Sequence, residues 1–271
     1  MIRFLSFSSG SCGNCYALLR ESPGGQRDGI LIDAGVSLRT VRGVLGSHGV
    51  DLRCIKAILV THDHWDHIRS LGMFCKKLSV PVYATSLLHG ALSGNPLCQQ
   101  YISPCRRDLV PLGWNPVAPG FEARYFVVPH DATETVGYAI RSDGHLFVLM
   151  TDLGSIPPDA MELAKQADTV VIESNFDVDM LLGGDYPREL KMRISEGHGH
   201  LSNDACAEAV KSFWHPGLRN LYLCHLSGNN NTPSIASRSA KAALEEIGAR
   251  DGTDLRVLER GVPSPLLILQ R

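Results

Sequence analysis

Short apolar runs separated by turn-forming residues recur along most of the 271-residue chain. Runs of about four to eight apolar residues, bounded by Gly, Pro, Asn, Asp or Ser, are typical of buried β-strands. The predicted strands cover residues 2–7, 16–19, 29–33, 55–61, 81–85, 122–128, 135–141, 145–151, 169–173 and 220–224, with possible edge strands at 255–258 and 266–270. A tight Ser-Asp-Gly turn at 142–144 is expected to join two of them.

Between these runs, apolar residues spaced three and four apart predict amphipathic helices. In residues 37–48, Leu38, Val41 and Leu45 share one face, and Ser37 is suited to cap the helix. Further helices are predicted at 68–78, 158–165, 188–196, 202–213 and 235–247. Residues 87–120 are less regular, and we expect a helix with loops there. We expect this segment and residues 176–186 to shape the opening to the substrate.

The order of these elements indicates one domain spanning residues 1–271. Strands and helices alternate in two halves of similar order, and the pattern predicts that the halves join near residue 150. No linker, charge run or low-complexity segment divides the chain. Such alternation favours two sheets packed face to face with helices outside, which is an α/β four-layer αββα sandwich.

Composition narrows the class of protein. Apolar residues make up 44% of the chain, but no stretch approaches the roughly 20 apolar residues of a membrane span. The N-terminus resembles a strand rather than a signal peptide, so we expect a cytoplasmic protein with no membrane partner. The eight cysteines are expected to be reduced, and the Cys12–Cys15 pair to lie in a tight turn. A net charge of −2 neither favours nor excludes nucleic acid.

The segment 61–67 carries the clearest chemical signal. His62, His64, Asp66 and His67 lie within six residues, directly after an apolar strand. Ionisable groups packed this closely repel one another unless a cation neutralises them. Neutral imidazole and carboxylate are ligands that zinc, manganese and iron accept. The spacing therefore predicts a metal site.

Three further candidates each follow an apolar strand. His130 follows residues 125–129, Asp152 follows 146–151, and His225 follows 221–224. Polar residues that recur at the ends of strands indicate a shared site at one edge of a sheet.

Together, the HxHxDH motif and the later His, Asp and His resemble the ligand set of the metallo-β-lactamase superfamily. That resemblance implies the metallo-β-lactamase fold and two divalent metal ions, Zn²⁺ or Mn²⁺. It implies that one ion is bound by His62, His64 and His130, that the other is bound by Asp66, His67 and His225, and that Asp152 bridges them.

Additional motifs are SSGSCGN at 8–14, LIDAG at 31–35, ESN at 173–175, YPRELKMRI at 186–194 and GHLSN at 199–203. They resemble the YycJ-like (WalJ) branch of that superfamily. This branch is associated with phosphodiester chemistry, including DNA exonuclease activity, and is similar to phosphoribosyl cyclic phosphodiesterases. The resemblance therefore implies a phosphodiester substrate, with DNA favoured. One departure is Phe176, where the branch usually has His.

The residues suggest roles in such a reaction. Two metal ions about 3.5–4 Å apart suit in-line displacement at phosphorus. Asp66 could bind metal and also orient the attacking water. His200, outside the ligand set, is the candidate to protonate the leaving group or hold the phosphate. The alternative for His200 is a structural position beside Ser202, a potential helix cap.

For four further residues, the sequence leaves two roles open. Arg188, Lys191 and Arg193 could meet phosphate oxygens or form a solvated helix face. Trp65 could stack on a nucleobase or pack against neighbouring side chains.

Alternative functions from the same pattern are a small-molecule cyclic phosphodiesterase, a thioester hydrolase and a non-catalytic metal-binding regulator. The complete ligand set disfavours the last. A nuclease with a large inserted β-CASP domain is disfavoured because only residues 153–224 separate Asp152 from His225. The sequence carries no signal for an oligomeric state.

Overall fold

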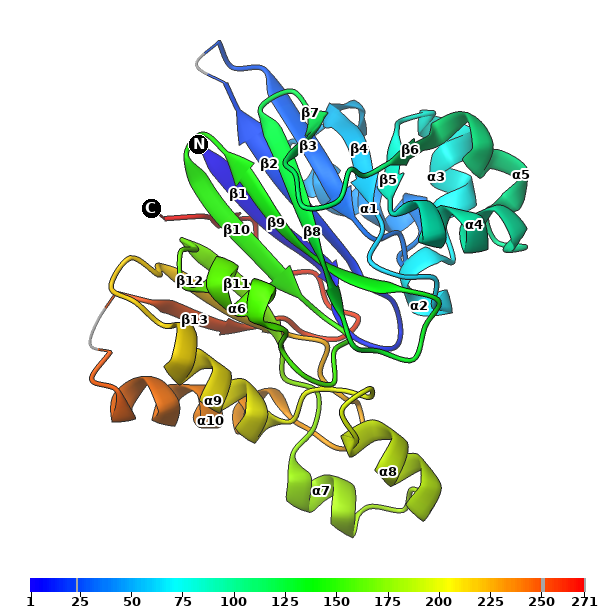
Figure 1. Cartoon of the computed structure of the whole chain (residues 1–271). Helices are drawn as coiled ribbons and strands as arrows, with labels where there is room; N and C mark the ends of the chain where they lie inside the picture. Colours follow the sequence, from blue (N-terminus) through cyan, green and yellow to red (C-terminus); the bar gives the residue numbers. More distant parts are fainter. Residues whose placement is uncertain (23, 250–251, 271) are drawn as a thin grey trace.

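Two seven-stranded sheets, packed face to face, form the centre of the molecule (Figure 1). A computed structural model describes residues 1–22, 24–249 and 252–270. Helices lie on the outer sides of the two sheets, so the predicted four-layer αββα sandwich is confirmed. Among the described residues, no helix has both the length and the hydropathy to cross a bilayer.

The first sheet has the strand order β14-β1-β2-β3-β4-β5-β6. Its strands are β1 (Ile2–Ser8), β2 (Cys15–Glu21), β3 (Arg27–Ile32), β4 (Ile55–Leu59), β5 (Val82–Ala84), β6 (Arg106–Asp108) and β14 (Leu267–Ile268). Strands β1 to β3 pair antiparallel, whereas β3 to β6 pair parallel. Its helical segments are α1 (Leu38–Ser47), η1 (Leu52–Cys54), α2 (Trp65–Ile68), α3 (Leu71–Leu78), α4 (Ser86–Gly94), α5 (Gln99–Ile102) and η2 (Ser103–Cys105).

The second sheet has the order β13-β12-β11-β10-β9-β8-β7. Its strands are β7 (Asn115–Ala118), β8 (Phe121–Val128), β9 (Thr135–Ser142), β10 (His145–Met150), β11 (Thr169–Glu173), β12 (Asn220–Cys224) and β13 (Asp254–Val257). Strands β7 to β10 pair antiparallel, and β10 to β13 pair parallel. Its helices are α6 (Pro158–Ala164), α7 (Val178–Gly183), α8 (Arg188–Ser195), α9 (Asn203–Phe213) and α10 (Pro233–Glu246).

Large aromatic side chains fill the space between the sheets. The ring of Phe4 lies 5.5 Å from that of Phe147, 5.6 Å from that of Tyr222 and 6.0 Å from that of Tyr16, measured between centroids. All four side chains are buried. Each sheet also packs a separate apolar cluster against its own helices, which explains why the central strands are apolar on both faces.

Local signals placed most elements correctly. The Ser37 side chain accepts a hydrogen bond from the backbone N–H of Thr40 and caps α1, and Leu38, Val41 and Leu45 form its buried face. The predicted helix at 68–78 begins later, at Leu71, because Ile68 is the last residue of α2. Between the two helices, Ser70 donates its backbone N–H to the carbonyl of Ala34, 3.0 Å away.

The prediction that the two halves join near residue 150 is wrong. The first sheet's β6 ends at residue 108, and β7 of the second sheet begins at residue 115. Antiparallel pairing of β7 to β10 puts residues 115–150 in the second sheet. Apolar periodicity reports burial but does not say to which sheet a strand belongs, and it did not indicate the short elements β6, β7 and α7.

Several strands end at the edge of the sandwich where the polar residues gather. Strands β10, β11 and β12 run parallel, so their carboxyl ends meet, and β3 and β4 do the same in the first sheet. Within two residues of the ends of β3, β10 and β12, Asp33, Asp152 and His225 have φ angles of 61°, 54° and 53°. Left-handed conformations are costly for residues with a side chain and tend to occur at functional sites.

Candidate metal centre

All seven of the predicted ligands lie in one cluster. Their side-chain ligand atoms fall into overlapping groups in which all atoms are within 4.8 Å of one another. One group is His62, His64 and His130, and a second is Asp66, His67 and His225. Asp152 belongs to two other groups, one with His62 and His67 and one with Glu173, His200 and His225. The chain therefore contains a His/Asp cluster able to bind metal ions.

Three buried imidazole nitrogens in this cluster test whether the residues suit a metal. Within the part of the chain that the structure describes, the Nε2 atoms of His62, His130 and His225 have no hydrogen-bond partner. An unpartnered buried polar atom costs about 1–3 kcal/mol, so such atoms need an explanation. A cation that accepts their lone pairs supplies one, and the residues present fit a metal ion.

The other nitrogen of each ring is held by the protein. The Nδ1 atom lies 3.0 Å from Thr61 Oγ1 in His62 and 3.0 Å from the carbonyl of Gly199 in His130. In His225, Nδ1 lies 2.8 Å from Glu173 Oε1. Such contacts fix the orientation of a ring and are usual behind metal-binding histidines.

Asp33 orients His67. Its Oδ2 atom lies 2.7 Å from His67 Nδ1, and both side chains are fully buried. Thr61 donates its backbone N–H and its hydroxyl to the same carboxylate, each over 2.8 Å. The loop after β3 can approach α2 this closely because residue 35 is glycine: a Cβ there would lie 1.6 Å from the backbone oxygen of Asp66.

Glu173 serves two histidines. Its Oε1 atom lies 2.8 Å from Nδ1 of His225 and 2.8 Å from Nδ1 of His200. Its Oε2 atom accepts the backbone N–H of Leu153 over 3.0 Å. Glu173 is fully buried. It is the last residue of β11 and contacts Leu153 after β10 and His225 after β12, so it connects the ends of these three strands.

Asn14 connects the Gly-rich turn after β1 to the same cluster. Its side-chain amide donates to Asp66 Oδ2 over 3.1 Å and lies 2.8 Å from His67 Nε2. The Asp66 carboxylate also lies 3.7 Å from Nε2 of His225. Cys12 lies in this turn and Cys15 begins β2, and both are free thiols.

Burial and charge divide the histidines into two kinds. Burial lowers the pKa of His62 and of His130 below the ordinary value, so these rings favour the neutral form that binds metal. Burial acts in the same direction on His67, but Asp152 and Asp33 outweigh it and raise the pKa to about 10.

Carboxylates give the part of the cluster around His225 and Asp152 an excess of negative charge. Burial alone would lower the pKa of His225, yet Asp152, Asp66 and Glu173 raise it well above the usual range. Burial opposes the charged form of Asp152, but His225 and His67 lower its pKa well below the usual range. Positive charge is strongly favoured here, and a metal ion would compete with protons for it.

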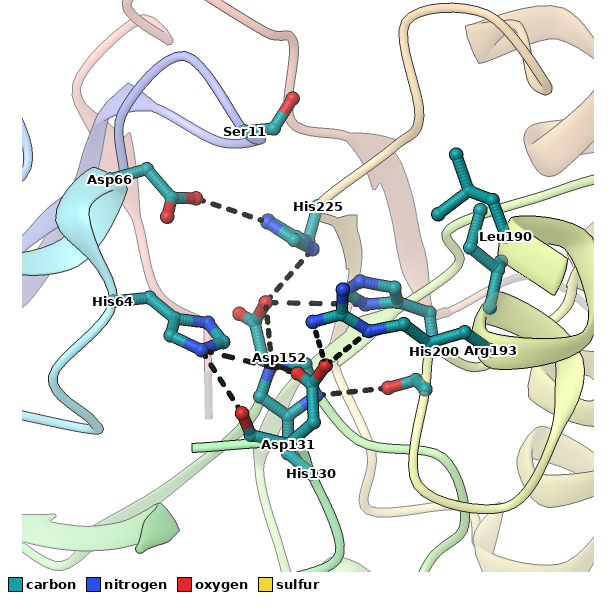
Figure 2. A pocket seen from close by; sticks show the side chains of 12 residues that line it. Ser11, His64, Asp66, His130, Asp131, Asp152, Leu190, Arg193, His200 and His225 are labelled. Atoms are coloured by element: carbon teal, nitrogen blue, oxygen red, sulfur yellow. Dashed lines mark hydrogen bonds and ion pairs between the residues drawn. The ribbon is translucent and has the colours of Figure 1, made fainter. Parts of the chain in front are cut away.

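A pocket of about 200 Å³ opens onto the cluster. His64 and Asp66 line one side, and Leu190 and Arg193 of α8 line the other (Figure 2). The prediction that residues 87–120 shape this opening is wrong, since within the described residues that segment contributes nothing to the pocket lining. The same is true of residues 176–186, and the outer wall comes from α8.

Arg193 and Asp131 form an ion pair at the mouth of the pocket. Arg193 donates to Asp131 Oδ2, over 2.6 Å from its Nε atom (Figure 2). The other oxygen of Asp131 lies 3.5 Å from His130 Nε2 and 4.0 Å from His64 Nε2. Helix α8 carries three basic residues, and of these Arg193 alone lines the pocket. Lys191 donates to the carbonyl of Leu182, and Arg188 is exposed to solvent.

His200 lies in the pocket wall beside the cluster. Burial disfavours its charged form, but Glu173 outweighs this and raises the pKa of His200. Ser202 does cap α9, accepting the backbone N–H of Ala205 over 3.1 Å, so capping does not require the His200 side chain. Phe176 is buried, pairs through its backbone with Ser202 and does not line the pocket.

Comparisons with known proteins agree with this geometry. Residues 29–226 match a family model described as the beta-lactamase superfamily domain. The chain is 33% identical over 251 residues to the exodeoxyribonuclease YycJ of Bacillus anthracis, covering 91% of this chain and 90% of that protein. It is 29% identical to the exodeoxyribonuclease WalJ of Streptococcus pneumoniae, covering 95% and 93%. The metallo-β-lactamase fold protein YhfI of Bacillus subtilis superimposes with a TM-score of 0.68 at 15% identity, over 97% of this chain and 99% of YhfI.

Proposed function

Because the chain belongs to the metallo-β-lactamase superfamily and, within it, to the family of YycJ and WalJ, we propose that this hydrolase is a two-metal DNA exonuclease. The observation that carries the proposal is the pair of ligand groups with Asp152 between them. The relatives named as exodeoxyribonucleases cover most of the chain, which supports DNA as the substrate.

In this proposal each ligand group holds one ion. His62, His64 and His130 would bind the first; Asp66, His67 and His225 would bind the second. Asp152 suits a bridge because its Oδ2 atom lies 3.2 Å from Nε2 of His67 and its Oδ1 atom 3.9 Å from Nε2 of His130. When bound, two Zn²⁺ or Mn²⁺ ions supply charge neutralisation at the phosphate and a water of lowered pKa.

Two side chains would handle the water and the proton. Asp66 lines the pocket with its Oδ2 atom held by Asn14, and this fixed carboxylate can orient the attacking water. His200 is fixed through Nδ1 by Glu173 and faces the pocket, so it can give a proton to the departing oxygen. Glu173 stabilises the charged imidazole from which that proton comes.

Arg193 is suited to hold the phosphate. Its guanidinium lines the pocket and is already paired with a carboxylate, that of Asp131. Guanidinium groups bind carboxylate and phosphate oxygens in the same paired geometry, so a phosphate could replace Asp131 as the partner.

We also propose a cytoplasmic location. All eight cysteines are free, and seven of them are buried, as small core residues often are. Free thiols persist in the reducing environment of the cytoplasm.

The test is hydrolysis of a labelled 5′-phosphorylated DNA duplex beside bis(p-nitrophenyl) phosphate, after reconstitution with Mn²⁺ or Zn²⁺. We expect stepwise shortening of the DNA from one end, loss of activity with a chelator, and two metal ions per chain by elemental analysis. Cleavage of the small ester alone would replace DNA by a small or cyclic phosphodiester. No cleavage of either substrate with two ions bound would refute phosphodiester hydrolysis.

A further inference from the structure

Trp65 differs from the other two tryptophans in its surroundings. Trp114 and Trp214 pack against the apolar cluster of the second sheet. Trp214 also donates its indole N–H to Thr253 over 3.2 Å. Trp65 is 54% exposed. Packing therefore explains Trp114 and Trp214 but does not explain Trp65.

Trp65 is adjacent in sequence to two residues that line the pocket. It is the first residue of α2, between His64 and Asp66, and both of these neighbours line the pocket. The backbone N–H of Arg69 donates to the carbonyl of Trp65 over 2.9 Å, which closes the helical turn. Figure 2 shows His64 and Asp66 on the side of the pocket that faces α8 and Arg193. Trp65 thus lies in the loop that supplies this side of the pocket, across from the proposed phosphate-binding cation.

Arg69 supports the indole from one face. Its guanidinium carbon lies 4.7 Å from the centroid of the Trp65 ring, within the range of a cation–π contact. Space for this arginine depends on Gly13, since a Cβ there would lie 3.0 Å from Arg69 Nη2. An exposed aromatic ring backed by a cation is a flat, oriented surface that also attracts anions.

We propose that Trp65, supported by Arg69, is a stacking platform for a nucleobase of the strand bound at the metal centre. This inference rests on the proposed exonuclease function. Every base has a π-face, so stacking binds a strand without selecting its sequence, as a processive or general exonuclease needs. A phosphate at Arg193 and a base on Trp65 would hold the strand at two separate points.

The test compares Trp65→Ala and Trp65→Phe with a matched control, Trp114→Ala. Trp114 is a suitable control because it also stacks with an arginine, with the guanidinium of Arg141 3.8 Å from its ring centroid, but packs on the second core. The substrates are a 5′-phosphorylated oligodeoxynucleotide and the same backbone with abasic residues at the cleaved end. Metal content is measured for every variant, because Trp65 lies between two proposed ligands.

With two metals retained, we expect Trp65→Ala to lower kcat/KM for the normal strand about tenfold or more. The abasic strand should be cleaved equally by Trp65→Ala and the unmodified protein, and Trp65→Phe should keep most activity. Binding of the normal strand should quench tryptophan fluorescence in Trp114→Phe but not in Trp65→Phe. Equal loss on both strands, or undiminished quenching in Trp65→Phe, would overturn the platform.

The same measurements separate this inference from the function beneath it. If the unmodified protein neither binds nor cleaves DNA, the exonuclease proposal fails. If it cleaves DNA and Trp65→Ala does so equally well, only the stacking platform fails.

Discussion

The carboxylate of Asp33 lies 2.7 Å from Nδ1 of His67, and both side chains are fully buried. The contact joins the end of β3 to the helix α2, across 34 residues of sequence. It fixes the ring so that Nε2 faces Asp152, 3.2 Å away. Asp33 is therefore a positioning residue for a proposed metal ligand.

We predict that Asp33→Asn weakens metal binding by about 10–100-fold, the usual effect of losing a partner behind a ligand. Competition with a chelator of known affinity measures this change. Asp28→Asn is the matched control, because Asp28 is also a buried carboxylate, near the start of β3, but pairs with Lys56 at 3.9 Å instead of with a histidine of the cluster. Equal metal affinity in Asp33→Asn and the unmodified protein would contradict the positioning role.

Asp152→Ala should abolish hydrolysis and lower the metal content, because it removes a carboxylate that lies near His67 of one proposed ligand group and His130 of the other. Elemental analysis and the phosphodiesterase assay check both effects. The variant also removes the negative charge that raises the pKa of His67 and His225, so positive charge is less favoured there. Two retained ions with normal turnover would rule out Asp152 as a bridge.

His200→Ala should slow turnover by about 10²–10⁴-fold while both metals stay bound, as expected for loss of a proton donor. Its contact with Glu173 is made by Nδ1, and Glu173 keeps its second partner, His225, in the variant. The metal content of the variant therefore distinguishes a proton donor from a metal ligand. Loss of an ion from His200→Ala would make this residue a ligand or a structural support.

Arg193→Ala should raise KM for DNA by about tenfold or more, because a hydrogen bond to a charged group contributes about 1.5–3 kcal/mol. Arg188→Ala removes the same charge from the same helix at a position that does not line the pocket, and it should leave KM nearly unchanged. Steady-state kinetics at fixed ionic strength compares the two. Equal effects would mean that α8 acts through its overall charge and not through Arg193.

Much of the fold could be predicted from the chain because apolar periodicity and capping are local. Strand β11 was predicted with its observed bounds, and Ser37 with its observed role as a cap. The sheet to which residues 115–150 belong was not predictable in this way, because membership depends on pairing between distant strands.

The site residues likewise differ in how far the sequence predicts them. His62, His64, Asp66 and His67 are neighbours in sequence, so their spacing alone predicted a metal site. His130, Asp152 and His225 were found because each follows an apolar strand. Asp33 and Glu173 carry the same signal at the ends of β3 and β11, and it could have found them.

The sequence by itself determined the chemistry proposed for the site, because the types and order of the candidate ligands are properties of the chain. Only the tertiary structure decided which side chains support them. Asn14 meets His67, and Arg193 meets Asp131, across 53 and 62 residues of sequence. Trp65 reads equally well as packing or as a binding surface until its exposure is known. Such contacts depend on how two sheets and their loops come together in space, and no local pattern encodes that arrangement.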